Sequence, residues 1–332
     1  MSDLKFRQHC SSKGMDRSKL GGRNMNLDYA ETYLKENEKK LLAGGKSGAC
    51  VYDIQGEYVL KQIYRAELGD DVLYEAYRKE VWWYASGGAG LDCLPEVLDL
   101  RSTQDEISIL MKRYDRLSRQ EINTELLGKI MRSLASVHGA EVPPLLKKKR
   151  CGAQPLLEEQ IRASVEGWRT VLDEHPGVFD HEPLERIAKE INRIIFWHDS
   201  EETVLTHGDF HWDNLLMDNQ GRIIICDWQG VGTGAISGDL SFFLGRLRGD
   251  GIRVNERELV EAYGRETERL FGKKVTWEEI DGHIRAANVI ISFRFWHEYL
   301  HGSSEGRVRD IYGKMVMDSI SNANLDLMDS YP

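Results

Sequence analysis

Three polar residues in the second half of the chain have the types and the spacing that phosphoryl transfer requires. Asp209 is followed by an amide side chain at Asn214 and by a second acid at Asp227. A phosphoryl-transfer site needs one group that positions the attacking hydroxyl, and oxygen ligands that hold Mg²⁺ on the phosphates. Asp209 suits the first role, and Asn214 and Asp227 suit the second.

A predicted hairpin brings the second acid close to this loop. Residues 222–226 (Arg-Ile-Ile-Ile-Cys) have the pattern of a buried strand, so Asp227 stands at its C-terminal end. Residues 219–221 (Asn-Gln-Gly) predict a turn that pairs this strand with residues 215–217. The alternative is a polar hairpin that carries its acids by chance.

Residues 207–214 (His-Gly-Asp-Phe-His-Trp-Asp-Asn) and Asp227 resemble the signature of the aminoglycoside phosphotransferase and choline kinase superfamily. That signature is an H-G-D-x-x-x-x-N loop and a later I-D-[WF] acid. Here Cys226 replaces the aliphatic residue, and Gln229 stands where many members carry glutamate. The resemblance implies a two-lobed, protein-kinase-like α+β fold with an antiparallel five-stranded N-lobe and a mostly helical C-lobe. It also implies transfer of the γ-phosphoryl group of Mg-ATP, with GTP left open, to a hydroxyl group of a small molecule.

A glycine-rich flap is expected in the first lobe, because residues 41–54 predict a strand, a glycine-rich loop and a second strand. Residues 44–47 (Gly-Gly-Lys-Ser) superficially suggest a Walker A loop, but position 40 is Lys where that motif needs glycine, and no helix pattern follows. Glycines in a flap let backbone N–H groups approach phosphate oxygens. The resemblance to aminoglycoside 3′-kinases implies that Ser47 and Gly48 contact phosphate; an ordinary hairpin turn is the alternative.

Lys61 lies in the next predicted strand, residues 58–63, where kinase-like folds carry a lysine that reaches the α- and β-phosphates. The expected partner of Lys61 is a glutamate on the following helix. Acidic residues at the start of residues 70–84 predict that this segment is helical. Glu80 is the first choice and Glu75 is the alternative. A solvent-facing salt bridge is the other interpretation of either glutamate.

The resemblance places the interlobe hinge at residues 111–114, after a predicted strand that begins at residue 107. An adenine ring binds such a segment through backbone donors and acceptors, so the resemblance nominates the backbone of Lys112 and Tyr114. Met111 suits the wall of the base pocket, but a methionine of the core would look the same.

His207 and Asp239 are expected to support the catalytic loop rather than to react. Residues 234–240 form a G-x-x-x-x-D-L pattern that resembles the element whose acid anchors this loop by hydrogen bonds. Phosphoryl transfer needs such support because small displacements of the reacting groups are costly. The alternative for Asp239 is an N-cap of a helix over residues 240–244. His138, which ends a predicted helix, is expected to be structural.

The acceptor site is the part of the protein that the sequence determines least. Helical patterns over residues 157–172 and 183–195 predict a helical hairpin, and the resemblance implies that it walls this site. A polycationic aminoglycoside would need carboxylates, whereas choline or ethanolamine would need an aromatic cage. The candidate carboxylates are Glu158, Glu159, Glu278, Glu279, Asp281 and Glu298, and the candidate aromatic residues are Trp228, Trp277, Trp296 and Tyr299. Both acceptor classes stay open, as does a nucleotide-binding module without activity.

Residues 297–301 (His297-Glu298-Tyr299-Leu300-His301) form a literal H-E-x-x-H, the sequence with which zinc proteases place two histidines on one helical face. A third ligand is missing, because Ser304 and Arg307 occupy the positions that the metzincin continuation requires, and no glutamate follows Glu305. A chance match in an aromatic-rich helix is therefore the preferred interpretation, with a zinc metalloprotease as the remote alternative.

Chain length, net charge and cysteine spacing limit the possible domain organisation, partners and location of the protein. A chain of 332 residues is long enough for about two domains, and we expect a flexible segment over residues 1–26, a nucleotide-binding lobe over 27–114 and a helical lobe over 115–332. The net charge of −10 argues against a nucleic-acid partner. The apolar stretches are too short for membrane helices, and five cysteines without C-x-x-C spacing indicate reduced thiols. We expect a cytoplasmic protein without a membrane partner, whose oligomeric state the sequence leaves open.

Overall fold

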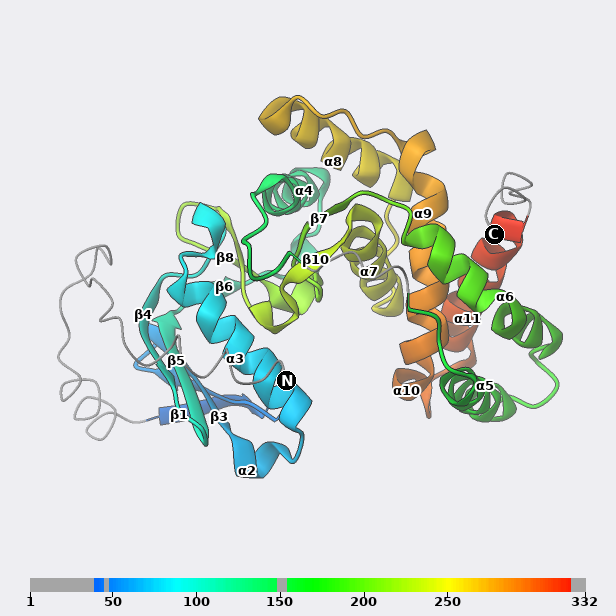
Figure 1. The fold of residues 1–332 in the computed structure, drawn as a ribbon, viewed down its shortest axis with the longest axis horizontal. Helices are drawn as coiled ribbons and strands as arrows, with labels where there is room; N and C mark the ends of the chain where they lie inside the picture. The colour runs from blue at the N-terminus through cyan, green and yellow to red at the C-terminus, as the bar shows by residue number, and fades with distance from the viewer. Residues whose placement is uncertain (1–38, 45–47, 148–153, 324–332) are drawn as a thin grey trace. The chain divides into compact units, whose positions relative to one another are not determined.

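A computed structural model describes residues 39–44, 48–147 and 154–323 (Figure 1). The expectations for residues 1–26 and for Ser47 lie outside this part of the chain. The chain separates into two compact units, one of Met1–Leu68 with Glu96–Arg113 and one of Gly69–Pro95 with Tyr114–Pro332. The predicted lobe boundary after residue 114 divides the chain differently, because Gly69–Pro95 belongs with the second unit.

The first unit is built on a five-stranded antiparallel sheet, as predicted. Its strands lie in the order β1-β2-β3-β5-β4. The strands are β1 (Lys39–Gly44), β2 (Cys50–Ile54), β3 (Tyr58–Tyr64), β4 (Val97–Ser102) and β5 (Glu106–Lys112), with the short helix α2 (Arg65–Leu68) after β3. Gln55 and Gly56, both with positive φ, are the central residues of the turn in which the N–H of Glu57 donates to the Ile54 carbonyl at 3.2 Å, and this turn suits the twist of the β2–β3 hairpin. Ile54, Leu60 and Leu110 form a buried cluster in this unit.

Helix α3 (Asp71–Ala85) packs within the second unit. Asp70 caps it by accepting hydrogen bonds from the N–H groups of Val72 and Leu73. Its buried face ends in Trp83, whose ring stacks on Trp228 with centroids 5.1 Å apart. This packing is the physical reason why the helix groups with the second unit.

Most of the second unit is helical. Its helices are α4 (Thr124–Gly139), α5 (Glu158–Asp173), α6 (Glu182–His198), α7 (Ile236–Gly249), α8 (Glu256–Phe271), α9 (Trp277–Ile291), α10 (His297–Leu300) and α11 (Glu305–Ala323). A π-helical turn, η6 (Ser292–Trp296), joins α9 to α10. Buried residues of α5, α6, α9 and α11 share one core, centred on Trp168 and Phe293, and α9 runs alongside α6 and α11 (Figure 1). The predicted helical hairpin is confirmed as α5 and α6.

Two small sheets carry the polar loops of the second unit. One contains β6 (Asp115–Arg116), β8 (Leu215–Met217) and β9 (Ile223–Ile225), and the other pairs β7 (Thr203–Thr206) with β10 (Gly232–Ala235). The predicted hairpin is confirmed, because β8 and β9 pair antiparallel from Leu215 opposite Ile225 to Met217 opposite Ile223. The loop of residues 207–214 therefore starts at the end of β7, and Asp227 follows β9.

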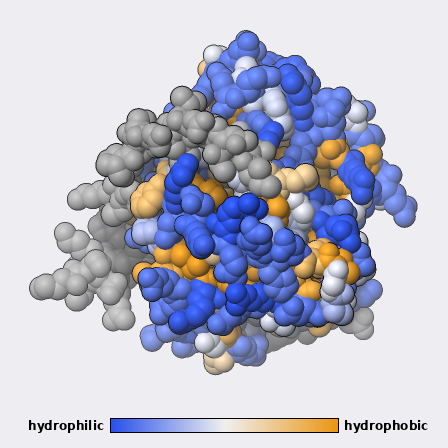
Figure 2. Space-filling view, turned by 90° about the vertical axis from the view of Figure 1, so that its right-hand side faces the viewer, coloured by the Kyte–Doolittle hydropathy of each residue, from blue (hydrophilic) through white to orange (hydrophobic). Residues whose placement is uncertain are grey.

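The surface at the α5, α6 and α11 end of Figure 1 is mainly hydrophilic. Figure 2 shows hydrophobic residues on this face in separate patches between hydrophilic ones. None of the helices in the described part of the chain has the length and hydrophobicity of a membrane span.

Candidate active site

Asp239, in the first turn of α7, anchors the start of the loop of residues 207–214. Its Oδ2 accepts a hydrogen bond from the N–H of His207 at 2.8 Å, and its Oδ1 accepts one from the N–H of Gly208 at 3.0 Å. The carboxylate is 3% exposed, so both backbone donors depend on it. The N-cap alternative is wrong, because α7 begins at Ile236 and Asp239 lies inside its first turn.

His138 completes the surroundings of this buried carboxylate. Its Nε2 lies 3.3 Å from Asp239 Oδ2, and its Nδ1 lies 2.8 Å from the hydroxyl of Tyr263. Burial alone would raise the pKa of Asp239, but the hydrogen bond and the charge of His138 outweigh it and lower that pKa. The expectation of a structural histidine at position 138 is confirmed, since both of its ring nitrogens have partners.

His207 is fully buried and uses both ring nitrogens inside the loop. Its Nδ1 accepts a hydrogen bond from the N–H of Asp209 at 3.3 Å, and its Nε2 donates to the carbonyl of Cys226 at 3.0 Å. Burial lowers the pKa of His207, which favours the neutral ring that this pattern requires. The ring therefore ties the backbone of Asp209 to the end of β9.

Gly208 allows two backbone segments to approach each other. Its φ is +80°, and a Cβ at this position would lie 2.4 Å from the carbonyl oxygen of Gly230. Any side chain would therefore push the loop away from the segment that follows Asp227.

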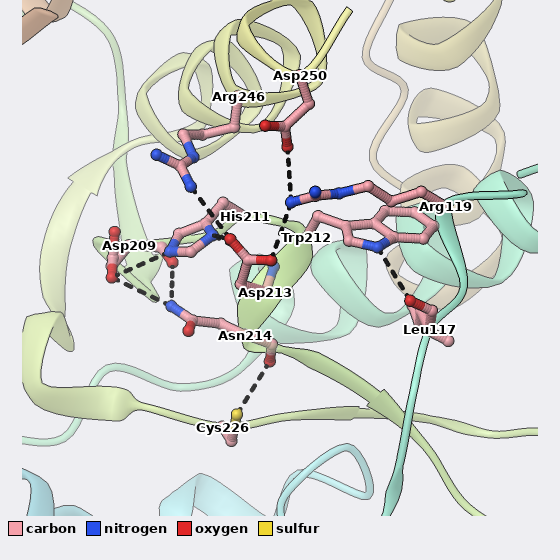
Figure 3. Close-up of polar contacts among 10 residues, drawn as sticks. All are labelled: Leu117, Arg119, Asp209, His211, Trp212, Asp213, Asn214, Cys226, Arg246 and Asp250. Atoms are coloured by element: carbon pink, nitrogen blue, oxygen red, sulfur yellow. Dashed lines mark hydrogen bonds and ion pairs between the residues drawn. The ribbon is translucent and has the colours of Figure 1, made fainter. Parts of the chain in front are cut away.

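The side chain of Asp209 is held through one of its two oxygens (Figure 3). Asn214 Nδ2 donates to Asp209 Oδ2 at 3.1 Å and to the Asp209 carbonyl at 2.9 Å. The Nε2 of His211 lies 3.5 Å from the same Oδ2. Burial opposes the charged form of Asp209, but the hydrogen bond and charge of His211 and the contact with Asn214 lower its pKa. The carboxylate is therefore ionised at neutral pH.

Asp227 is held in a strained conformation directly after β9. Its φ of +64° is unusual for a residue with a side chain, and such strain is characteristic of functional sites. The next residue, Trp228, donates its backbone N–H to Glu80 Oε1 at 3.2 Å and its ring N–H to the carbonyl of Ile225 at 2.7 Å. These bonds fix the backbone on the C-terminal side of Asp227.

Asn214 and Asp227 form a donor set that fits Mg²⁺. Cys226 donates its backbone N–H to the Asn214 carbonyl at 3.0 Å, and its Sγ lies 3.3 Å from the same oxygen, so the two predicted ligands are tied together through the backbone. The amide nitrogen of Asn214 already donates to Asp209, which leaves its side-chain oxygen as the ligand atom. One amide oxygen and one carboxylate are what Mg²⁺ takes from a protein when phosphates supply further ligands.

The glutamates proposed to pair with Lys61 differ sharply in environment. Glu80 is fully buried and accepts the N–H of Trp228. Glu75 is exposed and bonds to Arg78 at 3.0 Å, three residues along the same helix. This difference favours Glu80; its pairing with Lys61 stays a prediction.

The predicted nucleotide-binding residues of the first unit lie on adjacent strands or in the loop before them. Lys61 is 8% exposed in β3, and Met111 is 7% exposed near the end of β5. The N–H of Lys112 donates to the Glu96 carbonyl at 2.9 Å, so a role in binding the base would fall to its carbonyl group. Gly48 is exposed with φ of +76°, and Tyr114 follows β5 in the second unit.

The two acceptor hypotheses lose several of their candidate residues. Trp228 and Trp296 are 0% and 5% exposed, so they belong to the core and cannot face a bound amine. Glu278 bonds to Arg257 at 2.7 Å and Asp281 to Arg285 at 2.7 Å. Glu279 caps the start of α9 through the N–H of Thr276.

The H-E-x-x-H sequence does not have the geometry of a zinc site. Helix α10 ends at Leu300, so His301 lies beyond it, and its Nδ1 bonds to Glu174 at 3.0 Å. His297 packs against Trp168 with centroids 6.4 Å apart. The zinc-protease arrangement needs both histidines on one helical face, so the structure contradicts this alternative.

His211 is the site residue that sequence reasoning missed. A signal was present, because His207 and His211 each precede an acid by two positions, as His-Gly-Asp and His-Trp-Asp. In the structure, both rings accept a hydrogen bond from the backbone N–H of that acid.

Comparison with known proteins identifies a family that the sequence matches. The sequence profile of the phosphotransferase enzyme family matches residues 40–282. No curated protein matches the sequence.

Solved structures with a similar fold include kinases of small molecules. The choline kinase of Cryptosporidium parvum Iowa II is 13% identical with a TM-score of 0.56, over 93% of this chain and 94% of that one. Amicoumacin kinase hAmiN, in complex with AMP-PNP, Ca²⁺ and Ami, is 12% identical with a TM-score of 0.54, over 90% and 94%. ADP-bound aminoglycoside phosphotransferase APH(2'')-Ib is 16% identical with a TM-score of 0.50, over 88% and 97%. The predicted protein-kinase-like α+β fold is confirmed.

Proposed function

The chain belongs to the phosphotransferase enzyme family, and on this premise we propose that it transfers the γ-phosphoryl group of Mg-ATP to a hydroxyl group of a small molecule. The observation that carries the proposal is the state of Asp209. Its carboxylate is ionised, one oxygen is fixed by Asn214 and His211, and its backbone is fixed by His207. Such a group is built to orient a hydroxyl.

Asp209 positions the acceptor and takes its proton. The hydroxyl oxygen forms a bond to the γ-phosphorus while the bond to the bridging oxygen of ADP breaks, and the hydroxyl proton passes to the Asp209 carboxylate. Because the pKa of Asp209 is low, the proton moves late in the reaction and positioning contributes more than deprotonation of the bound alcohol. His207 and Asp239 support this carboxylate through the loop backbone.

The nucleotide would be held by residues of both units. Asn214 and Asp227 would hold Mg²⁺, which when bound neutralises charge on the phosphates. Lys61, paired with Glu80, would contact the α- and β-phosphates, and Gly48 would approach them through its backbone. The carbonyl of Lys112, the backbone of Tyr114 and the side chain of Met111 would bind the base.

An alcohol that also carries an amine is the proposed acceptor class. The similar structures include an aminoglycoside phosphotransferase and a choline kinase, whose names both specify such acceptors. Burial of Trp228 and Trp296 weakens the case for an aromatic cage, while Glu158, Glu159 and Glu298 are exposed and suit a cationic, hydroxyl-rich antibiotic. Choline and ethanolamine are the alternative.

The test is a screen for acceptor-dependent ADP release. Aminoglycosides, choline, ethanolamine and simple sugars are each offered with Mg-ATP and with Mg-GTP, and the product is examined by mass spectrometry for a phosphate ester. Release of ADP with a phosphorylated product supports the proposal. Failure of every acceptor, with nucleotide binding intact, contradicts it.

Site variants assign the roles once an acceptor is found. Asp209→Asn and Asp227→Ala should each lower kcat by about 10²–10⁴-fold while the thermal midpoint of unfolding stays close to that of the wild type. Lys61→Ala should raise the dissociation constant of the nucleotide more than Asp209→Asn does. Near-normal turnover by Asp209→Asn would refute the assignment of that residue.

A further inference from the structure

The ring of His211 is aimed at the catalytic carboxylate by its own loop (Figure 3). Its Nδ1 accepts a hydrogen bond from the backbone N–H of Asp213 at 3.3 Å. A neutral ring that accepts at Nδ1 carries its proton on Nε2. That Nε2 lies 3.5 Å from Oδ2 of Asp209, so an N–H faces the carboxylate.

The surroundings of the ring hold it in this orientation. Its side chain is only 13% exposed, and it meets the edge of Phe242, a residue of α7, with centroids 5.8 Å apart. Holding a ring against a packed helix limits its rotamers, so Nε2 does not point freely into solvent.

Asp213, which sets the ring through its backbone, is itself clamped by two arginines. Arg119 lies 3.1 Å from its Oδ1, and Arg246 lies 3.1 Å from its Oδ2. Arg119 also pairs with Asp250 at 3.0 Å, at the C-terminal end of α7. The loop segment that orients His211 is thus fastened to α7 and to the 3₁₀ turn η3 (Arg119–Glu121).

The two donors face only one of the two carboxylate oxygens of Asp209. Asn214 Nδ2 and His211 Nε2 both face Oδ2, and none of the hydrogen bonds among the described residues uses Oδ1. The side chain of Asp209 is 31% exposed, so solvent or a ligand can reach it. A carboxylate held in this way has one fixed oxygen and one oxygen for the acceptor.

We propose that His211 is a positioning residue for phosphoryl transfer, which holds Oδ2 of Asp209 so that Oδ1 receives the acceptor hydroxyl. The inference rests on the proposed function and adds to it the atom that binds the hydroxyl and the side chain that selects that atom. Without the His211 donor, Asn214 alone restrains Oδ2, so the carboxylate turns more easily about its side-chain torsion and the hydroxyl meets it in several geometries. Misplacement of this kind costs rate rather than nucleotide affinity.

The kinetic test compares two substitutions of different chemistry. His211→Leu removes the donor, and His211→Gln keeps an N–H near the position of Nε2. We expect His211→Leu to lower kcat by about 10- to 100-fold with little change in the KM of the nucleotide, and His211→Gln to restore kcat to within about threefold of the wild type. Equal turnover by His211→Leu and the wild type overturns the inference, as does an equal loss in both variants.

A spectroscopic test decides the geometry without turnover. The protein is labelled with ¹⁵N-histidine, and the ring nitrogens of His211 are assigned from the signals that His211→Gln removes. We expect a protonated Nε2 and an acceptor Nδ1. A protonated Nδ1, or a freely exchanging ring, overturns the inference even if the wild type is an active kinase. A wild type without phosphoryl transfer that keeps the expected ring signals rejects the proposed function instead.

Discussion

At the scale of single residues, the catalytic loop repeats one local device. His207 and His211 each accept, at Nδ1, the backbone N–H of the acid two positions later. Each then directs Nε2 elsewhere, His207 to the Cys226 carbonyl and His211 to Asp209. Side chains that bond to their own backbone in this way fix a loop without secondary structure. The first histidine thus fixes the backbone of Asp209, and the second fixes its side chain.

Gly208→Ala tests how closely this loop must pack. A Cβ at position 208 would lie 2.4 Å from the Gly230 carbonyl oxygen, and the φ of +80° is unfavourable for alanine. We expect kcat to fall by about 10²-fold or more, because the loop must shift relative to the segment that follows Asp227. The measurement is steady-state kinetics together with urea denaturation.

Gly238→Ala is the matched control. Gly238 lies in α7, just before Asp239, and a Cβ there would meet nothing within 4 Å. Alanine in a helix should leave turnover unchanged and raise the unfolding free energy by up to about 1 kcal/mol. Retention of activity by Gly208→Ala would show that the backbone approach does not matter, and an equal loss in Gly238→Ala would show that the effect is not specific to position 208.

The sequence was sufficient to predict which polar residues local spacing brings together, whereas their roles stay a prediction. Asp209, Asn214 and Asp227 lie within one loop and one hairpin, so a linear motif describes their arrangement. Glu80 could be nominated only from a helix pattern and a family resemblance, because its bond to Trp228 joins residues 148 positions apart. The clamp on Asp213 involves Arg119 and Arg246 from separate elements, and no local pattern reports such a contact.

At the scale of secondary-structure elements, helix α7 holds more residues of the loop in place than its sequence pattern indicates. Its first turn carries Asp239, which holds the start of the loop, and its later turns carry Phe242 and Arg246, which hold the His211 segment. The helix starts at Ile236, earlier than its apolar pattern suggested, because β10 leads directly into it. One rigid element therefore contacts both ends of the loop of residues 207–214.

The substitution Asp239→Asn tests whether Asp239 anchors the start of the loop or is only a buried polar residue. The two carboxylate oxygens of Asp239 accept different N–H groups, and an amide has only one acceptor oxygen. One buried donor is left without a partner, so we expect the unfolding free energy to fall by about 1–3 kcal/mol, with a clear loss of kcat. Urea denaturation and steady-state kinetics measure the two effects.

Asp218→Asn provides the comparison for this prediction. The carboxylate of Asp218 also accepts two backbone N–H groups, from Gln220 and Arg222, but both bond to Oδ1. An asparagine can keep both bonds and loses only the ion pair with the exposed Arg222 side chain. The stability cost should be smaller and turnover unchanged. A similar cost in both variants would argue against the anchoring role of Asp239.

At the scale of the whole molecule, Lys61 lies in the first unit, and Asp209, Asn214 and Asp227 lie in the second. The same large second unit also buries several histidines in its core, and these link the stability of the molecule to pH.

His198, at the end of α6, should dominate this pH dependence. Burial, and the nearby His283, lower its pKa from 6.5 to about 4, while its Nε2 lies 3.0 Å from the hydroxyl of Ser237. Glu201, whose Oε1 accepts the N–H of Ser237, lies in the same cluster, 3.8 Å from His283. Since the pKa is lower in the folded state, the unfolded chain binds the proton first as the pH falls. The contribution of His198 is therefore complete above about pH 6.5 and is lost between about pH 6.5 and 4.

We expect the unfolding free energy to decrease by up to about 3 kcal/mol across this window because of His198, and burial of His207 acts in the same direction. Asp209 and Asp239, whose pKa values are lowered below 3.8, lose their contributions only at lower pH, so they do not account for this slope. Urea denaturation between pH 7 and pH 5 measures the upper part of this decrease, about 2 kcal/mol. His198→Gln keeps a hydrogen-bonding group for Ser237 but cannot titrate, and it should flatten the pH dependence. An unchanged slope in that variant would mean that the linkage lies in other residues.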